Sequence, residues 1–243
     1  MPLTNDNNIR MRRINILILL LAFVAGMKAQ QPTAYDINVG DFNELKVSDG
    51  INVNYKFSAD SAGKAYFDCP ARMVSAFIFT NKGGKLTVQL SPESIGTKDL
   101  PDITVCSKFL TKVENNGDST LRVLSANGVP KFEAILEGNG RLSVKGVDAN
   151  DVKAVMRLGK GTLVISGQCR DAKLDLTGTG VIQADELVAQ NASVSAKGTG
   201  SVGVNAVNNL GIFGMGTTSI YYVGSPAIKN RSVGLKLYPL NKD

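Results

Sequence analysis

Two glutamates, Glu114 and Glu137, are the side chains best spaced for acid–base chemistry. Each stands three residues before the second glycine of a recurring Gly-x-Gly pattern or of its degenerate first copy. If the copies stack as neighbouring coils, the two carboxylates lie about 5 Å apart, and their repulsion raises the pKa of one of them, as a general acid requires. Asp118 and Arg141, one residue after the same glycines, would stack beside them. This pattern predicts a glycan-active β-helix enzyme as the alternative to a binding role.

Other catalytic chemistry finds little support in the sequence. Histidine is absent, which excludes Ser-His-Asp and Cys-His catalysis and nearly all catalytic zinc sites. Cys69, Cys106 and Cys169 are too far apart for a CxxC redox or zinc pattern, and their disulfide state stays open. The stretch from Gly198 to Gly203 has the letters of a dinucleotide fingerprint, but a strand pattern follows it where a helix is needed. We therefore expect no cofactor and no metal.

A repeat would position the two glutamates. Its spacing is about twenty residues, which indicates a solenoid rather than a meander of hairpins. The first copy is the degenerate Asn115-Asn116-Gly117. The later copies supply the turn glycines Gly138, Gly140, Gly159, Gly161, Gly178, Gly180, Gly198, Gly200, Gly214 and Gly216. We expect each pair to form a sharp structural corner between two strands.

Apolar residues fill four positions of each copy, at six and four residues before the second glycine and two and four after it. These positions would face inward as columns; the column two residues after the glycine holds Leu142, Leu163, Ile182 and Val202. Arg157 interrupts one column. Either a register slip turns Met156 inward instead, or Arg157 is a buried functional residue. The predicted fold is all-β, a right-handed β-helix-like solenoid with Gly-x-Gly coils of about twenty residues, preceded by a β-strand and hairpin region.

The start of the chain has the features of an export signal. Arg10, Arg12 and Arg13 precede the apolar run 14–24, which is too short to span a bilayer, and a cleavage site follows Ala29. Translation from Met1 or from Met11 fits equally. The predicted organisation is a signal peptide at 1–29, an N-terminal β region with a hairpin at 30–102, coils at 103–225 and a C-terminal tail at 226–243. No transmembrane helix is expected after signal removal.

Charge excludes nucleic acid as the partner. Four basic residues and one acidic residue lie in the first 29 positions, so half of the net charge of +6 belongs to the signal peptide. The remaining excess is scattered, whereas nucleic-acid binding needs a clustered basic stripe with aromatic residues in it.

Three features together resemble a known family. They are the segment Val47-Ser48-Asp49-Gly50-Ile51-Asn52-Val53, the hairpin ending Gly84-Lys85-Leu86-Thr87-Val88, and the Gly-x-Gly coils. In this order they are similar to the putative auto-transporter adhesin, head GIN domain family, which is common in secreted proteins of Bacteroidetes. The resemblance covers roughly residues 42–225. It implies an exported β-helix-like domain with no known catalytic residues to transfer.

We therefore expect an exported binding or structural module, adhesin-like and not an enzyme, in the periplasm or on the cell surface of a Gram-negative bacterium. Its ligand would be an extracellular or envelope glycan or protein, contacted by outward rows of the coils. The candidate contact residues are Asp118, Arg141, Tyr221 and Tyr222. Open solenoid ends expose strand edges that need caps or partners, so homo-oligomerisation is a further expectation.

Overall fold

The computed structural model describes residues 32–126 and 128–240. The predicted signal peptide at 1–29, and the choice between Met1 and Met11, lie outside the described residues. Within them the chain is almost entirely β, with two short 3-10 turns, η1 (Ala71–Ala76) and η2 (Pro92–Ser94). None of the described helices is long and apolar enough to cross a membrane.

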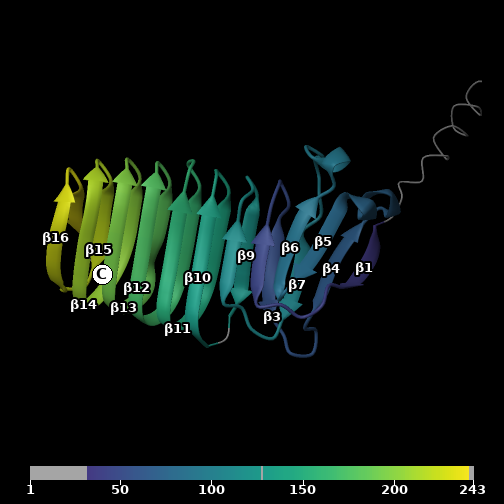
Figure 1. The fold of residues 1–243 in the computed structure, drawn as a ribbon, viewed down its shortest axis with the longest axis horizontal. Coiled ribbons are helices and arrows are strands. Elements are labelled where there is room, and N and C mark those ends of the chain that lie inside the picture. The colour runs from purple at the N-terminus through teal and green to yellow at the C-terminus, as the bar shows by residue number, and fades with distance from the viewer. Residues whose placement is uncertain (1–31, 127, 241–243) are drawn as a thin grey trace, which may run out of the picture.

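The strands lie side by side along one long axis, from β1 near one end to β16 at the other (Figure 1). They are β1 (Thr33–Asn38), β2 (Glu44–Val47), β3 (Val53–Phe57), β4 (Lys64–Cys69), β5 (Phe77–Lys82), β6 (Lys85–Leu90), β7 (Ile103–Ser107), β8 (Lys112–Asn115), β9 (Thr120–Ser125), β10 (Val129–Glu137), β11 (Arg141–Arg157), β12 (Thr162–Gly178), β13 (Val181–Gly198), β14 (Ser201–Gly216), β15 (Ser219–Val223), β16 (Ala227–Val233) and β17 (Lys236–Pro239).

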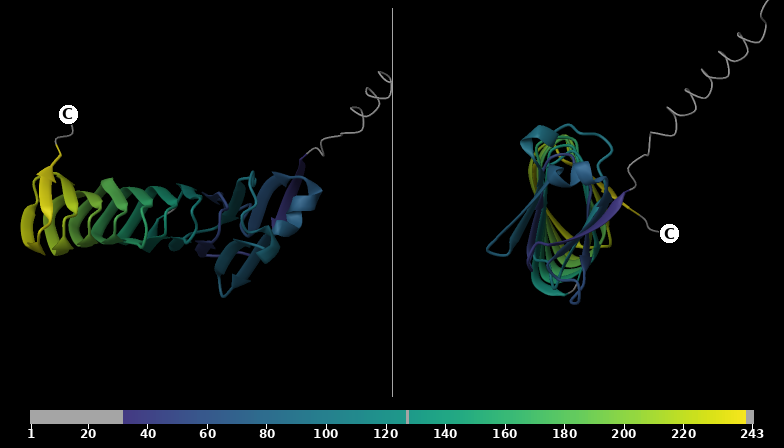
Figure 2. Two further views of the ribbon diagram at one scale, coloured as in Figure 1. Left: turned by 90° about the horizontal axis from the view of Figure 1, so that it is seen from above. Right: turned by 90° about the vertical axis from the view of Figure 1, so that its right-hand side faces the viewer.

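The predicted solenoid is confirmed in the stretch from β11 to β14. Each of these strands bends around most of one coil and pairs in parallel with the next. Viewed down the long axis, the coils superimpose as a narrow closed outline (Figure 2). The column Leu142, Leu163, Ile182 and Val202 lies in register inside it, with every member 0% exposed. Because one coil cannot cover its own apolar side chains, each depends on the next.

The register slip at Arg157 is confirmed. Met156 stacks between Leu136 and Leu176 and is 0% exposed, whereas Arg157 points to solvent beside Glu137. A second slip occurs near the end, where Ile212 rather than Leu210 stacks on Val194. Counting from the glycines therefore placed Val155 and Leu210 in the wrong columns, because the number of residues between strand and turn differs from coil to coil.

The N-terminal strands join the same stack in an order that differs from the sequence. β2 lies between β6 and β8, and β3 lies between β7 and β9, all in parallel. The predicted hairpin is confirmed as β5 and β6, which pair antiparallel around Gly83 and Gly84, both with positive φ. It projects from the side of the stack (Figure 2). Antiparallel pairing of β1 with β4 closes this end.

The region expected to be a C-terminal tail contains a further coil. β16 and β17 pair in parallel with β14 and β15. The coil with Tyr221 and Tyr222 is therefore covered by another coil. Thr218 is 0% exposed, and its hydroxyl donates to the carbonyl oxygen of Gly198 at 3.0 Å.

Close backbone contact at the corners makes a test of the stacking. A Cβ on Gly200 would overlap the carbonyl oxygen of Gly180 and lie 2.9 Å from the Leu176 side chain. We expect Gly200→Ala to lower the free energy of unfolding by about 2 to 3 kcal/mol, because neighbouring coils must separate to admit the methyl group.

Gly50→Ala is the matched control, since a Cβ there meets nothing within 4 Å. Urea unfolding followed by circular dichroism measures both variants. Equal stability of the two would contradict the stacking geometry.

Candidate ligand-binding groove

The structure separates the two glutamates of the predicted acid–base pair. Glu114 lies in register with Ile135, and Glu137 lies in register with Arg157. The first coil explains the error: Asn115 aligns with Leu136, and Thr120 aligns with Arg141. Gly117 therefore corresponds to the first glycine of the next corner and not to the second. The count from Gly117 was two residues out of register.

Glu114 is an ion-pair partner in a basic setting. Its Oε1 lies 2.8 Å from Lys46 Nζ, and its Oε2 lies 3.8 Å from Lys85 Nζ. Burial by itself raises the pKa of Glu114, but the hydrogen bond from Lys46 and the charges of both lysines outweigh it and hold the pKa below its usual value. A general acid needs the opposite shift. Glu137 is paired with Arg157, at 3.5 Å between Oε1 and Nη1.

The other predicted site residues are also not brought together. Asp118 Oδ1 accepts from the backbone nitrogen of Asn139 at 3.4 Å, one coil along, whereas Arg141 is an exposed register partner of Thr120. Tyr221 is 37% exposed and stacks on Tyr238 of the following coil, with ring centroids 5.3 Å apart. Tyr222 packs partly against the core. These positions do not form a common site.

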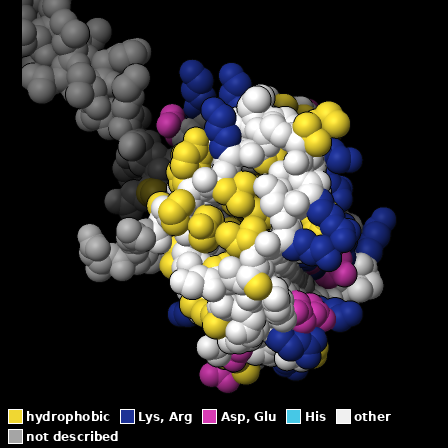
Figure 3. All heavy atoms as spheres, turned by 90° about the vertical axis from the view of Figure 1, so that its left-hand side faces the viewer, with side chains coloured by type: hydrophobic (Ala, Val, Ile, Leu, Met, Phe, Trp, Pro, Cys, Tyr) yellow, Lys and Arg dark blue, Asp and Glu magenta, His cyan; other side chains and the backbone are white. Residues whose placement is uncertain are grey.

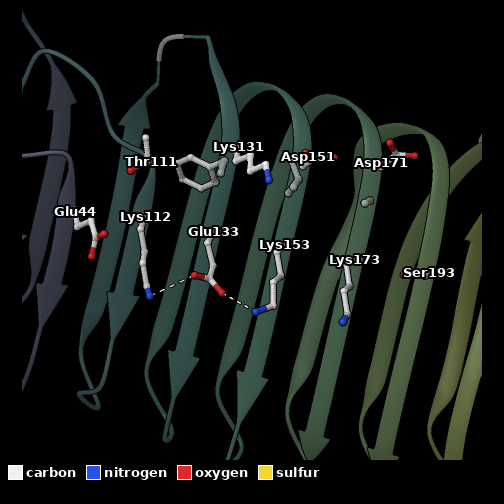
Figure 4. Close-up of a pocket in the computed structure, with 13 residues that line it drawn as sticks. Glu44, Thr111, Lys112, Lys131, Glu133, Asp151, Lys153, Asp171, Lys173 and Ser193 are labelled. Carbon is white, nitrogen blue, oxygen red and sulfur yellow. Dashed lines mark hydrogen bonds and ion pairs between the residues drawn. The ribbon is translucent and has the colours of Figure 1, made fainter.

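A groove that the sequence did not predict crosses the coils on another face. Its volume is about 600 Å³, and it runs from β2 across β8, β10, β11 and β12 to β13 (Figure 4). One wall is a row of register partners, Glu44, Lys112, Glu133, Lys153, Lys173 and Ser193. The other is the row Lys131, Asp151 and Asp171. Because both rows belong to hydrogen-bonded strands, their spacing is set by the backbone.

Glu133 lies at the centre of the first row. Lys153 donates to its Oε1 at 2.8 Å, and Lys112 Nζ lies 3.3 Å from its Oε2 (Figure 4). Burial tends to raise the pKa of Glu133, but the hydrogen bonds and charges of these two lysines outweigh it and lower the pKa. The carboxylate is therefore locked between two cations and holds both lysine side chains along the groove.

Beyond Lys153 the alternation of charge stops. Lys173 is its register partner on β12, so two ammonium groups follow one another in the row, and Ser193 comes next. On the opposite wall, a hydrogen bond from Arg170 lowers the pKa of Asp171, and Asn191 donates to the same carboxylate at 3.0 Å. The groove lining carries equal numbers of lysines and carboxylates, so it presents both donors and acceptors without a strong net charge.

The described residues offer no sign of a metal or redox centre. Within 32–126 and 128–240, no group of three or more His, Cys, Asp or Glu is placed to hold a metal ion. Cys69, Cys106 and Cys169 are free and buried, which answers the open question of their pairing. Burial raises the pKa of Cys169 to about 11.

Residues 41–226 match the model of a family described as putative auto-transporter adhesin, head GIN domain. The chain belongs to this family. The resemblance inferred from the sequence is thus confirmed, and the adhesin family implies an exported or cell-surface protein. No curated protein matches the chain.

Solved structures share the fold of this head GIN domain. A putative adhesin from Bacteroides fragilis is 22% identical, with a TM-score of 0.77 over 87% of this chain and 97% of that one. A putative lipid binding protein from Parabacteroides distasonis is 17% identical, with a TM-score of 0.69 over 88% and 98%. A putative adhesin from Parabacteroides merdae is 17% identical, with a TM-score of 0.65 over 88% and 98%.

The sequence did contain a signal for the groove. In the coils of the head GIN domain, each residue of the groove row that contains Glu133 directly precedes an inward-facing residue. Lys153 precedes Ala154, for example, and Lys173 precedes Leu174. A search for polar residues at this outward position would have found it. Alignment on the glycines hid the pattern, because the distance from this position to the turn varies.

The lowered pKa of Glu133 predicts a pH-dependent contribution to stability. Because the pKa of Glu133 is lower in the folded than in the unfolded chain, its ionised carboxylate stabilises the fold above about pH 4.3. This contribution is lost as the pH falls through the folded-state pKa. We expect Glu133→Gln to lower the free energy of unfolding by about 1 kcal/mol at pH 7, a small effect because the lysine partners are partly exposed. The difference from the unsubstituted chain should shrink as the pH falls below about 4.3.

Urea unfolding at pH 7, 5 and 3 measures this difference. Glu186→Gln, at an exposed position of β13, is the control and should show no comparable pH dependence. A constant difference for Glu133→Gln across this range would contradict the ion-pair assignment.

Proposed function

We propose that this head GIN domain is an exported, non-catalytic adhesion module that binds an extended polar glycan of the cell envelope or its surroundings in the groove from β2 to β13. The observation that carries this proposal is the row of polar side chains repeated at every strand along the groove. The site works in the periplasm or on the outer surface, in keeping with the basic and apolar residues at the start of the chain.

A glycan suits the chemistry of the lining. Sugar hydroxyls both donate and accept hydrogen bonds, and the groove offers lysine donors beside carboxylate acceptors. The strand spacing of about 4.8 Å is close to the length of one sugar residue, so a chain lying across the strands meets a polar side chain at each step. Lys153 and Lys173 stand next to one another in the row, so a sugar carboxylate or hydroxyl at that step can accept hydrogen bonds from both ammonium groups.

Binding also suits the rigidity of the site. Lys112, Glu133 and Lys153 hold one another in place, and the backbone beneath them is hydrogen-bonded on both sides. A ligand therefore meets side chains that have already lost much of their freedom, which lowers the entropic cost of binding. The carboxylates first considered for catalysis are ion-paired elsewhere, so the groove is proposed as a binding surface alone.

The test is a glycan array probed with labelled chain starting at residue 30, followed by titration of the strongest glycan. We expect the Lys112→Ala, Lys153→Ala double variant to bind at least tenfold more weakly, because two charged donors are lost and each contributes about 1 kcal/mol or more.

Lys145→Ala is the matched control, since Lys145 lies on the same strand as Lys153 and does not line the groove. It should bind as the unsubstituted chain does. An array without any bound glycan, or an equal loss in both variants, would sink the proposal.

A further inference from the structure

The last coil has a free strand edge. β16 pairs with β14, and β17 pairs with β15; among the described residues no strand lies on the outer side of either. β16 stands at the extreme end of the stack (Figure 1). The backbone N–H and C=O groups that point outward there are a template for one more strand.

The inward columns are open at this end. Ile228 stacks on Leu210, but Ile228 is 40% exposed whereas Leu210 is 0% exposed. Leu237 likewise stacks on the buried Ile220 and is itself only partly covered. Viewed onto this end, hydrophobic side chains form a central patch (Figure 3). A strand added to β16 and β17 would cover Ile228 and Leu237, whose equivalents in the preceding coils are buried.

The charged residues of the last described coils are all basic. From residue 187 to residue 240 the sequence contains no Asp or Glu, while Lys197, Lys229, Arg231 and Lys236 lie there. Lys229 and Arg231 alternate with the inward residues of β16 and are exposed. Basic side chains border the hydrophobic patch in the end view (Figure 3). A partner of opposite charge is therefore favoured over a neutral or basic one.

A second copy of this chain fits the edge poorly. An antiparallel two-fold pairing of β16 with itself, centred on Asn230, places Lys229 of one copy opposite Arg231 of the other. Like charges directly opposite one another destabilise a strand pair. The edge therefore calls for a different chain.

From the free edge, the open columns and the exposed cations of the described residues, we infer that the outer edge of β16 binds an extended polypeptide segment in which apolar residues alternate with Asp or Glu. Its backbone continues the sheet, its apolar side chains cover Ile228 and Leu237, and its carboxylates lie beside Lys229 and Arg231. Near Asn230, whose Oδ1 accepts from the Ser232 hydroxyl at 2.6 Å, the segment carries a small or polar residue. This site is separate from the groove, so the domain would bind a protein segment at β16 in addition to the glycan proposed for the groove.

The probe is an array of nine-residue peptides that alternate Asp or Glu with Val, Ile, Leu or Thr, beside a second array with Lys in place of every acid. Labelled chain starting at residue 30 is applied to both, and fluorescence anisotropy measures the best peptide. We expect retention on the acidic array only. Lys229→Glu with Arg231→Glu should weaken that binding at least tenfold and shift retention toward the lysine array, because two attractive charge pairs become repulsive.

Arg72→Glu with Lys98→Glu is the matched control, since it reverses two exposed cations far from this edge and changes the net charge equally. It should leave peptide binding unchanged. Equal retention on both arrays, retention on neither, or an equal loss in both double variants overturns the inference. So does binding to anionic phosphatidylglycerol vesicles without peptide binding, or sedimentation of a dimer that the Lys229 and Arg231 substitutions dissociate.

Discussion

Parallel stacking of the chain on itself is the constraint on which the structure depends. Each coil leaves apolar side chains open on both sides, and only the next coil at the strand spacing can cover them. This spacing also brings backbone against backbone at the corners, where a Cβ on Gly140 would overlap the carbonyl oxygen of Gly117. Glycine at these corners is therefore a requirement of stacking as much as of turning. Every other feature of the domain is arranged around this repeat.

The same constraint organises the surface. Side chains that alternate outward fall into rows, so each charge has a neighbour one strand away on either side. Glu133 shows the benefit, since Lys112 and Lys153 flank it on both sides at 3.3 and 2.8 Å. Lys153 beside Lys173 shows the cost, because register brings two like charges together. Each of these lysines still has a carboxylate partner, Glu133 at 2.8 Å for Lys153 and Asp175 at 3.8 Å for Lys173.

The repeat could be predicted from the sequence because glycine corners and apolar columns are local signals. The register between neighbouring coils could not be predicted, because it depends on the number of residues between each strand and the following turn, and this number varies. Asn115 shows why: it is 0% exposed in an inward column, and its side chain donates to the carbonyl oxygens of Ser119 and Arg141. A polar residue can stand in this inward column because it supplies the corner's hydrogen bonds. The sequence pattern therefore gave the wrong alignment for the first coil, and Glu114 does not pair with Glu137. The position of β2 between β6 and β8 was equally hidden, because it joins residues far apart in sequence.

The two ends of the stack are unequal, and this limits how the domain can assemble. At the β1 end, Phe67 and Phe77 are buried and pack edge to face with centroids 5.1 Å apart, while Tyr35 stacks on Phe67. These aromatic side chains bury one another at the β1 end, whereas Ile228 is 40% exposed and Leu237 is only partly covered at the β16 end. Head-to-tail stacking needs open columns on both partners and, when the rotation does not close, produces filaments. With one end covered and the other bordered by cations, the fold permits a single added strand without permitting endless growth.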